Sequence, residues 1–187
     1  TDLSQLLNGV DRVFHLAALP GVRSSWGHTF ADYLSHNVMS TQALLEACKD
    51  SSIQRFTYAS SSSVYGDTNV LPMQEDASTW PYSPYGVTKL AAENMVRLYQ
   101  RNFGVPTVSV RYFTVYGPAG RPDMSVLRFV RWIAEGDTLH LNGDGSQERD
   151  FTYVEDVARG TIAALGQLGY EIINIGSDAP APLMSVI

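Results

Sequence analysis

Thiols are almost absent from this sequence of 187 residues, which contains a single cysteine, Cys48. One thiol cannot form an internal disulfide, so the sequence excludes a fold held together by disulfide bonds. This cysteine usage is typical of a reducing compartment, and we expect the protein to be cytoplasmic. Cys48 lies in the segment ALLEACKD, where we interpret it as a small buried residue of a helix rather than as a reactive thiol.

Long apolar runs are also absent. No segment reaches the roughly eighteen apolar residues that a membrane-spanning helix needs, so no membrane span is predicted. The first residues, TDLSQLLNGVDRVFHLAA, contain neither a methionine nor the basic and then apolar pattern of a signal peptide. We therefore expect the chain to begin in the middle of a fold.

Positive charge is in short supply, because 13 lysines and arginines stand against 19 aspartates and glutamates, for a net charge of −6. A general nucleic-acid surface needs clustered cations, so no nucleic-acid partner is predicted. Eleven of the thirteen cations are arginines. Since a guanidinium can hold a carboxylate or phosphate through two hydrogen bonds, a small anionic ligand stays open. The four histidines show no metal-ligand pattern, and no metal site is predicted.

Strand-like and helix-like segments alternate along the chain. Short apolar runs predict strands, and apolar residues at helical spacing predict helices. The predicted strands are residues 10–18, 53–61, 106–113, 138–143 and 171–176. The predicted helices are residues 30–50, 85–103, 124–135 and 154 to about Leu168. This alternation favours an α/β fold, in which helices cover both faces of a parallel sheet.

Three of these strands end in distinctive residues, HLAALPG, YASSSSVYG and RYFTVYGP. A parallel α/β sheet usually binds its ligands at the carboxyl ends of its strands. The strand ends are therefore the predicted location of a functional site.

The segment SPYGVTKLAAENMVRLYQRNFG contains the clearest chemical pattern of the sequence. Tyr85 and Lys89 are four residues apart, so a helix presents them on one face. An ammonium beside a phenol lowers the phenol's pKa from about 10, which lets the phenolate take a proton from an alcohol. The hydroxyls of Ser60–Ser63, at the end of the preceding strand, could bind the same substrate oxygen. Serine, tyrosine and lysine together predict a proton-transfer site.

Six stretches together resemble one known family. They are, in chain order, VFHLAALPGVRSSW, YASSSSVYGD, SPYGVTKLAAE, VRYFTVYGP, GDGSQERDFTYVEDVARG and INIGS. The set is similar to the motifs of extended short-chain dehydrogenase/reductases, in the branch of NAD-dependent nucleotide-sugar epimerases and dehydratases. PGVRSSWG, RYFTVYG and GRPDMSVLRF look most like UDP-glucuronic acid 4-epimerases. The resemblance covers nearly the whole chain and implies a Rossmann-like, doubly wound parallel sheet with a smaller C-terminal substrate-binding part.

The resemblance also implies roles for individual residues. Tyr85 matches the catalytic base, Lys89 the residue that binds the nicotinamide ribose and tunes that base, and Ser61 the catalytic hydroxyl. NAD is the implied cofactor, and the residues expected beside it are Leu16, Ala17, Ala18, Asn37, Ser60, Tyr85, Lys89, Tyr112 and Phe113. The residues expected to contact the UDP-sugar are Arg23, Ser61, Ser62, Ser63, Thr114, Arg121, Arg128 and Arg149. For Arg149 a surface ion pair with Asp150 is the alternative.

The reaction implied is 4-epimerisation through transient oxidation at C4 of the sugar, and UDP-glucuronate is the expected substrate. Related dehydratases place an acidic residue after the catalytic hydroxyl, where this sequence has Ser62 and Ser63. A carboxylate there would repel glucuronate, whereas hydroxyls can donate to it. UDP-glucose or UDP-N-acetylglucosamine is the alternative substrate, and Thr114 replaces an asparagine common in UDP-glucose epimerases. A dehydratase and a non-catalytic nucleotide sensor are further alternatives.

Some family features are not found in this sequence, namely the N-terminal strand, the glycine-rich phosphate loop and the acidic residue for the adenosine ribose. We therefore expect an internal segment of a longer enzyme that binds NAD poorly by itself. Residues 1–117 are expected to form the C-terminal portion of a Rossmann domain, and residues 118–187 part of a nucleotide-sugar-binding domain, with a strand and helix segment returning to the first. The family also implies a homodimer through helices 32–49 and 85–103.

Overall fold

The computed structural model describes residues 2–68, 70–166 and 169–187. These residues form two compact units. Unit 1 comprises Thr1–Tyr112 and Thr161–Asn174, and unit 2 comprises Phe113–Gly160 and Ile175–Ile187. The domain division predicted near Pro118 stays a prediction.

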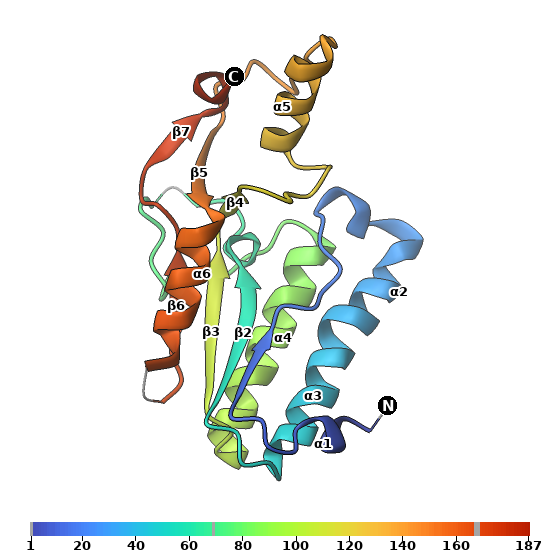
Figure 1. The fold of residues 1–187 in the computed structure, drawn as a ribbon, viewed down its shortest axis with the longest axis vertical. Helices are drawn as coiled ribbons and strands as arrows, with labels where there is room; N and C mark the ends of the chain where they lie inside the picture. Colours follow the sequence, from blue (N-terminus) through green and yellow to red (C-terminus); the bar gives the residue numbers. More distant parts are fainter. Residues whose placement is uncertain (1, 69, 167–168) are drawn as a thin grey trace. The chain divides into compact units, whose positions relative to one another are not determined.

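The centre of unit 1 is a four-stranded sheet with the order β1-β2-β3-β6 (Figure 1). Its strands are β1 (Arg12–His15), β2 (Arg55–Ser61), β3 (Thr107–Tyr112) and β6 (Ile172–Ile175). β1 pairs in parallel with β2, and β2 pairs in parallel with β3. The predicted α/β fold with parallel strands is therefore confirmed, and all four strands lie inside predicted ranges.

The helix α4 (Pro84–Phe103) begins and ends where its sequence predicts. The Ser83 side chain accepts a hydrogen bond from the Gly86 N–H, and Pro84 occupies the first turn, where its missing N–H costs nothing. Gly104 ends the helix with a φ of 72°, a left-handed conformation that suits glycine. The predicted helix over residues 85–103 is thus confirmed.

The second long helical segment of unit 1 is not a uniform α-helix. It consists of α2 (Phe30–Tyr33), the π-helical segment η3 (Leu34–Met39) and α3 (Ser40–Lys49). The helix predicted over residues 30–50 is confirmed in position, while its π-helical middle is not a feature that apolar spacing predicts. π-helical turns often occur at functional sites.

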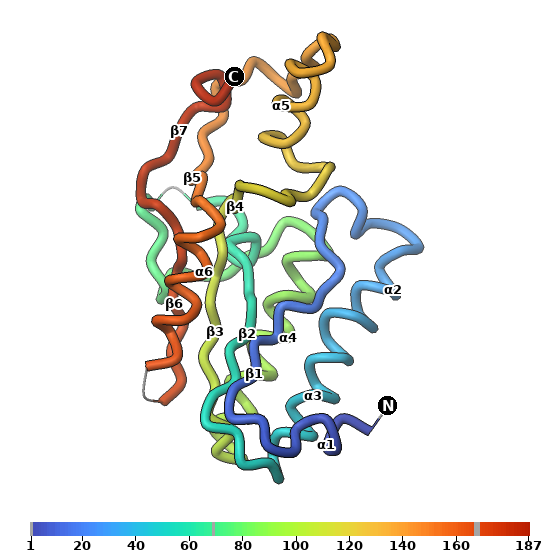
Figure 2. The backbone as a smooth tube through the Cα atoms, viewed as in Figure 1, coloured from blue at the N-terminus to red at the C-terminus, as the bar shows by residue number. Residues whose placement is uncertain are grey.

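The core of unit 1 lies where α3 and α4 pack against the sheet, and the tube in Figure 2 shows these helices beside it. Fully buried side chains from both helices and from β2 meet there, including Leu45, Phe56, Tyr58 and Val96. Cys48 belongs to the same cluster, as predicted, and burial raises the pKa of its thiol to about 11. The short helix α1 (Leu3–Leu6) lies beside α3.

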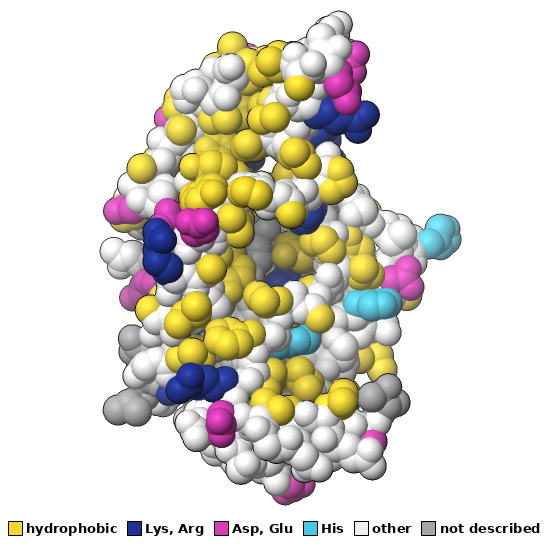
Figure 3. Space-filling view, viewed as in Figure 1, with side chains coloured by type: hydrophobic (Ala, Val, Ile, Leu, Met, Phe, Trp, Pro, Cys, Tyr) yellow, Lys and Arg dark blue, Asp and Glu magenta, His cyan; other side chains and the backbone are white. Residues whose placement is uncertain are grey.

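Unit 2 contains a small sheet with the order β4-β5-β7. Its strands are β4 (Thr114–Tyr116), β5 (Glu148–Tyr153) and β7 (Pro180–Pro182); β4 and β5 are parallel, and β5 and β7 are antiparallel. The predicted helix over residues 124–135 is confirmed as α5 (Ser125–Glu135). On the face shown in Figure 3, hydrophobic side chains gather on this unit, and Val130 and Ile133 of α5 are each 57% exposed.

The strand predicted over residues 138–143 is wrong. Residues 137–141 have no regular structure, and the turn that follows contains Gly143 and Gly145, both with positive φ. An alternating pattern forms a strand only where a partner strand offers hydrogen bonds, and in unit 2 β5 occupies the central position instead.

The helix predicted from Val154 is observed as α6 (Val154–Ala163), followed by the 3-10 turn η5 (Ala164–Gly166). Its predicted end at Leu168 lies outside the described residues. The remaining short turns are η1 (Arg23–Ser25), η2 (Gly27–Thr29), η4 (Ser62–Val64) and η6 (Leu183–Val186). None of the helices within residues 2–68, 70–166 and 169–187 has the length and apolar character of a membrane span.

Candidate active site

The start of α4 lies directly against the end of β2, and Gly86 makes this approach possible. A Cβ atom on Gly86 would lie 2.6 Å from the carbonyl oxygen of Ser63 and 2.8 Å from Cβ of Pro81. Both distances are too short for non-bonded atoms, so any side chain here would push the helix away from the serines. The missing side chain of Gly86 thus brings Tyr85 and the serine-rich strand end into one site.

Tyr85 is half-buried in the first turn of α4, and its ring packs edge-on against Tyr33 with 6.3 Å between ring centres. The hydroxyl of Tyr33 lies within hydrogen-bond distance of the Pro20 and Gly21 carbonyl oxygens, at 2.7 and 3.0 Å. Tyr33 therefore connects the catalytic tyrosine candidate with the loop after β1. The sequence analysis did not identify Tyr33, so this contact was not predicted.

Lys89 is buried one turn after Tyr85, with 3% of its surface exposed. Its ammonium lies 4.6 Å from the centre of the Tyr58 ring, an arrangement that favours a cation. Burial lowers the pKa of Lys89 to about 8, and the nearby carboxylate of Glu93 opposes this shift. Lys89 is therefore a desolvated cation that still carries its proton at neutral pH.

His15, at the end of β1, is the neutral neighbour of this cation. Burial, together with the charge of Lys89, lowers the pKa of His15 to about 4. The Thr41 hydroxyl donates to the Asn37 carbonyl oxygen at 2.7 Å, so it accepts from His15 Nε2 at 2.8 Å. This hydrogen bond fixes one tautomer of a buried, uncharged imidazole.

Asn37 lies in the π-helical segment and holds the loop after β1. Its Oδ1 accepts from the Leu19 N–H at 2.7 Å, while Nδ2 donates to the Leu19 carbonyl oxygen at 3.0 Å and to Thr88 Oγ1 at 3.1 Å. Both amide hydrogens are thus used within the chain. These hydrogen bonds attach Asn37 to Leu19 in the loop after β1, and in the same loop Leu16 and Ala17 are exposed and Ala18 is half-buried.

The serines at the end of β2 differ from one another. The Ser60 hydroxyl is buried and has no hydrogen-bond partner within the part of the chain that the structure describes. Ser61 Oγ accepts from the Ser63 N–H at 3.2 Å and keeps its own proton for donation. Ser62 and Ser63 are half-buried in η4. The Thr57 hydroxyl, earlier in β2, is also buried without a partner, but Ser60 lies at the strand end, where a bound molecule would complete its hydrogen bond.

Two further predicted residues belong to unit 1. Tyr112 ends β3, and its hydroxyl lies 2.9 Å from Thr161 Oγ1. Burial raises the pKa of Tyr112. Arg23 is exposed in η1. Unit 1 therefore brings Tyr85, Lys89 and the serines together, while Arg23 stands on the surface.

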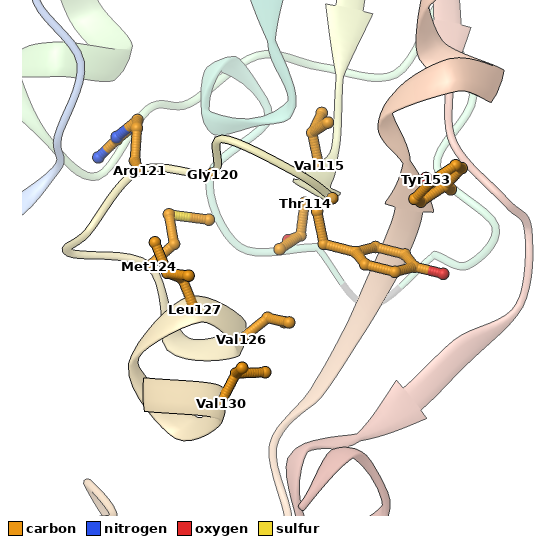
Figure 4. Close-up of a pocket in the computed structure, with 11 residues that line it drawn as sticks. Thr114, Val115, Gly120, Arg121, Met124, Val126, Leu127, Val130 and Tyr153 are labelled. Atoms are coloured by element: carbon orange, nitrogen blue, oxygen red, sulfur yellow. The ribbon is translucent and has the colours of Figure 1, made fainter. Parts of the chain in front are cut away.

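Unit 2 contains a pocket with a volume of about 370 Å³. Figure 4 shows Val126 and Val130 of α5 on one side and Thr114 and Tyr153 on the other. Its lining is mostly apolar: Thr114, Val115, Tyr116, Gly117, Gly120, Arg121, Met124, Val126, Leu127, Val130 and Tyr153. Of the predicted substrate residues, Thr114 and Arg121 line this pocket. The segment GRPDMSVLRF supplies much of the lining, so the quoted motif could have identified it.

The predicted arginines of unit 2 have different surroundings. The Arg121 guanidinium donates to both carboxylate oxygens of Asp123, at 3.0 and 2.5 Å, and it lies at one end of the pocket (Figure 4). Arg128 stacks on the Trp132 ring with Cζ 4.5 Å from the ring centre. Neither Arg128 nor Arg149 lines the pocket.

The alternative role of Arg149, an ion pair with Asp150, is not found among the described residues. The Asp150 carboxylate instead accepts hydrogen bonds from the Ser177 N–H, the Ser177 hydroxyl and the Asp178 N–H. Arg149 is exposed and donates to the Glu148 carbonyl oxygen at 2.7 Å. Phe113 packs next to Gly176 within the same unit, since a Cβ there would lie 3.4 Å from its ring.

No group of three or more histidine, cysteine, aspartate or glutamate side chains within residues 2–68, 70–166 and 169–187 could hold a metal ion.

Comparisons with known proteins support one family. The model of the NAD dependent epimerase/dehydratase family matches residues 1–176. An uncharacterized UDP-glucose epimerase YtcB of Bacillus subtilis is 49% identical over 188 residues, covering 100% of this chain and 59% of that protein. A UDP-glucuronate 4-epimerase of Thermodesulfobacterium geofontis is 48% identical over 168 residues, covering 89% of this chain and 51% of that protein.

A solved structure of a UDP-glucuronic acid 4-epimerase has a fold similar to that of this chain. The crystal structure of UDP-glucuronic acid 4-epimerase from Bacillus cereus, in complex with UDP-glucuronic acid and NAD, has a TM-score of 0.94 and 49% identity. It covers 98% of this chain, which spans 59% of that chain. The predicted Rossmann-like class is confirmed by this likeness. The family match over residues 1–176, together with the Tyr85–Lys89 helix and its serine-rich strand end, shows that the chain belongs to the NAD-dependent epimerase/dehydratase family.

Proposed function

We propose that the protein is an NAD-dependent 4-epimerase that interconverts UDP-glucuronate and UDP-galacturonate. The observation that carries this proposal is the position of Tyr85 and Lys89 one turn apart on α4. The start of this helix can lie close to the serines at the end of β2 because Gly86 has no side chain. Relatives that bear the name UDP-glucuronate 4-epimerase support the choice of substrate. The chain spans 59% and 51% of the two curated relatives described above, so the activity belongs to the full-length protein.

The residues present fit a nicotinamide cofactor. The buried Ser60 hydroxyl lacks a protein partner in the described chain, and Lys89 presents a buried ammonium donor. We propose that these two, with the backbone of Leu16–Ala18 after β1 and the side chain of Tyr112, hold NAD. Phe113 is a further proposed contact. When bound, NAD would supply reversible hydride acceptance at C4 of the sugar.

The proton chemistry falls to this chain's own side chains. As a phenolate, Tyr85 accepts the proton of the sugar 4-hydroxyl and later returns it to the same oxygen. The Lys89 ammonium stabilises the phenolate form electrostatically. Ser61 donates a hydrogen bond to that oxygen, because its own Oγ already accepts from the Ser63 N–H. Each proton taken is given back, so the side chains return to their starting states.

The substrate carboxylate and the nucleotide need different surroundings. The hydroxyls of Ser62 and Ser63 can donate to a C6 carboxylate, whereas an acidic side chain would repel it. The unit 2 pocket has apolar walls for a uracil ring, and Thr114 and Arg121 can donate to the sugar or diphosphate. Arg23, Arg128 and Arg149 stay proposed contacts of the anionic ends, since all three are exposed or half-buried.

One alternative has specific support. YtcB carries the name of a UDP-glucose epimerase, although it is uncharacterized. A neutral hexose would need no partner for a carboxylate, so Ser62 and Ser63 would then contact a C6 hydroxyl.

Product analysis of the full-length protein tests the proposal. With NAD present, UDP-glucuronate should give UDP-galacturonate, detected by chromatography and NMR of the sugar. Conversion of UDP-glucose but not UDP-glucuronate would establish the alternative instead. A 4-keto-6-deoxy product would indicate a dehydratase, and no product from any of these nucleotides would favour a sensor.

We also propose that the protein is a cytoplasmic homodimer that pairs through helices 32–49 and 85–103. The exposed apolar side chains Met39, Val87 and Leu98 on these helices support this surface. Light scattering should give twice the monomer mass, and a strictly monomeric protein that retains full activity would contradict the proposal.

A further inference from the structure

Glu93 of α4 and Arg111 of β3 form a buried ion pair in unit 1. Their side chains are 4% and 3% exposed, and Arg111 binds both carboxylate oxygens, with Nη2–Oε1 at 2.6 Å and Nε–Oε2 at 3.0 Å. Removing two charges from water is costly, and an apolar pair of similar volume often stabilises a protein equally well. Stability alone therefore does not explain why charged residues occupy these positions.

Arg111 also contacts the segment that follows the serines of β2. Its Nη1 donates to the Glu75 carbonyl oxygen at 3.0 Å, and its Cζ lies 4.6 Å from the centre of the Tyr65 ring. Tyr65 directly follows η4, and its N–H donates to the Ser62 carbonyl oxygen at 3.1 Å. The ion pair thus connects α4 with the turn that carries the proposed substrate hydroxyls.

Glu93 lies one helical turn after Lys89, and its charge acts on that ammonium. The carboxylate raises the pKa of Lys89, in opposition to the larger effect of burial. The other titratable groups around Lys89 are His15 of β1, Tyr58 of β2 and Tyr85 of α4. His15 is neutral because its pKa is lowered to about 4, and Tyr58 is neutral because burial raises its pKa.

Among the described residues, Glu93 is therefore the carboxylate whose negative charge acts on Lys89. Arg111 lies behind it and fixes the orientation of the carboxylate. Glu93 is thus connected through Arg111 to the segment that follows η4, and its charge also raises the pKa of the Lys89 ammonium.

We propose that Glu93, oriented by Arg111, is a positioning residue that keeps Lys89 charged beside Tyr85. Through Arg111 it also holds α4 in place beside the turn η4 (Ser62–Val64). This inference rests on the proposed function for its catalytic meaning. Its electrostatic part concerns Lys89 alone and holds whatever the substrate is.

Glu93→Gln in the full-length enzyme tests the catalytic part, because glutamine keeps the shape and removes the charge. We expect kcat to fall by about tenfold while KM for the UDP-sugar changes less than about twofold. The alkaline limb of the kcat profile should move to lower pH, since Lys89 would lose its proton earlier. Glu135→Gln is the matched control, because Glu135 forms an exposed pair with Arg131 on α5 and should leave the profile unchanged.

NMR of the lysine side chains tests the electrostatic part without any assay of activity. The chain contains two lysines, Lys49 and Lys89, so labelling at the ε-carbon gives two assignable signals, with Lys89→Met identifying one. In Glu93→Gln the titration of Lys89 should shift to lower pH, while Lys49, paired with Glu46, should not change. Glu93→Asp, which keeps the charge, should restore most of the Lys89 titration.

The outcomes separate the two proposals. An unchanged Lys89 titration in a folded Glu93→Gln protein would overturn the positioning role. So would a Glu93→Asp protein whose Lys89 titration moves as far as that of Glu93→Gln, or a lower melting temperature with an unmoved pH profile. A wild-type protein that forms no epimer, but whose Lys89 titration shifts as described, would overturn the proposed function and leave the electrostatic role intact.

Discussion

At the scale of single residues, the candidate site depends on a cation that is expensive to bury. The pKa of Lys89 falls from 10.5 in water to about 8 in the folded chain, chiefly through desolvation. In the unfolded chain Lys89 keeps its proton up to higher pH than in the folded chain. Burial of the charged Lys89 therefore lowers the free energy of unfolding by its full amount below about pH 8. This cost fades as the pH rises from about 8 toward 10.5.

Lys89→Met should therefore stabilise the full-length protein while abolishing its catalysis. The expected gain in unfolding free energy at pH 7 is up to about 3 kcal/mol, and it should shrink toward zero near pH 10. Urea unfolding at both pH values measures the difference. A variant that is less stable than the parent at pH 7 would show that the ammonium stabilises the fold.

The sequence predicted the residues of this site better than their contacts. The spacing of Tyr85 and Lys89 follows from helix geometry, so their common face could be predicted. The partners of Asn37 could not, because Leu19 and Thr88 reach it from distant parts of the chain. The same holds for Arg111, whose pairing with Glu93 depends on the packing of a strand against a helix.

At the scale of secondary-structure elements, the contact between α4 and the end of β2 is the feature that the site needs most. Gly86→Ala would place a Cβ 2.6 Å from the Ser63 carbonyl oxygen, a backbone atom that cannot rotate away as the end of a flexible side chain would. We expect the unfolding free energy to fall by about 1 to 3 kcal/mol. We also expect kcat of the folded variant to fall, because Tyr85 would no longer lie close to the serines. Thermal unfolding and initial rates measure the two effects.

Gly166→Ala is the control, because a Cβ at Gly166 meets no atom within 4 Å. Its effect on stability should stay within about 0.5 kcal/mol. Equal effects of the two alanines on kcat would contradict the importance of the close approach.

Elements with local signals were predicted well, and elements without them were not. The ends of α4 are marked by Ser83, Pro84 and Gly104, all neighbours in sequence of the turns that they form. The π-helical turn over Leu34–Met39 has no such mark, because tertiary hydrogen bonds of Asn37 accompany it. The strand β5 was missed because ERDFTY is charged and lacks alternation.

At the scale of the whole molecule, the alternation of strands and helices predicted the α/β class, and the motifs predicted the family. The small sheet of unit 2 was not predicted, since β4 and β7 contain three residues each and form only where β5 offers hydrogen bonds. Residues 138–143 show the converse, because their alternating pattern suits a strand but no neighbouring strand pairs with them in the described structure. Pairing between distant segments is the information that a local pattern lacks.

Because this chain spans only part of the length of its relatives, its function must be tested with the full-length protein. The chain spans 59% of the Bacillus cereus epimerase to which it is similar, and the cofactor and substrate proposals therefore concern the full-length protein. Assays should use that protein with NAD and each UDP-sugar in parallel.

The most direct test of the account is the turnover number of Tyr85→Phe in the full-length enzyme, with Tyr82→Phe as the control. Tyr82 is an exposed tyrosine three residues earlier, outside the helix. Removing the Tyr85 hydroxyl should lower kcat by about 10² to 10⁴-fold with little change in folding, while Tyr82→Phe should retain the parent rate. A Tyr85→Phe enzyme that turns over at the parent rate would contradict the claim that this phenol carries the proton.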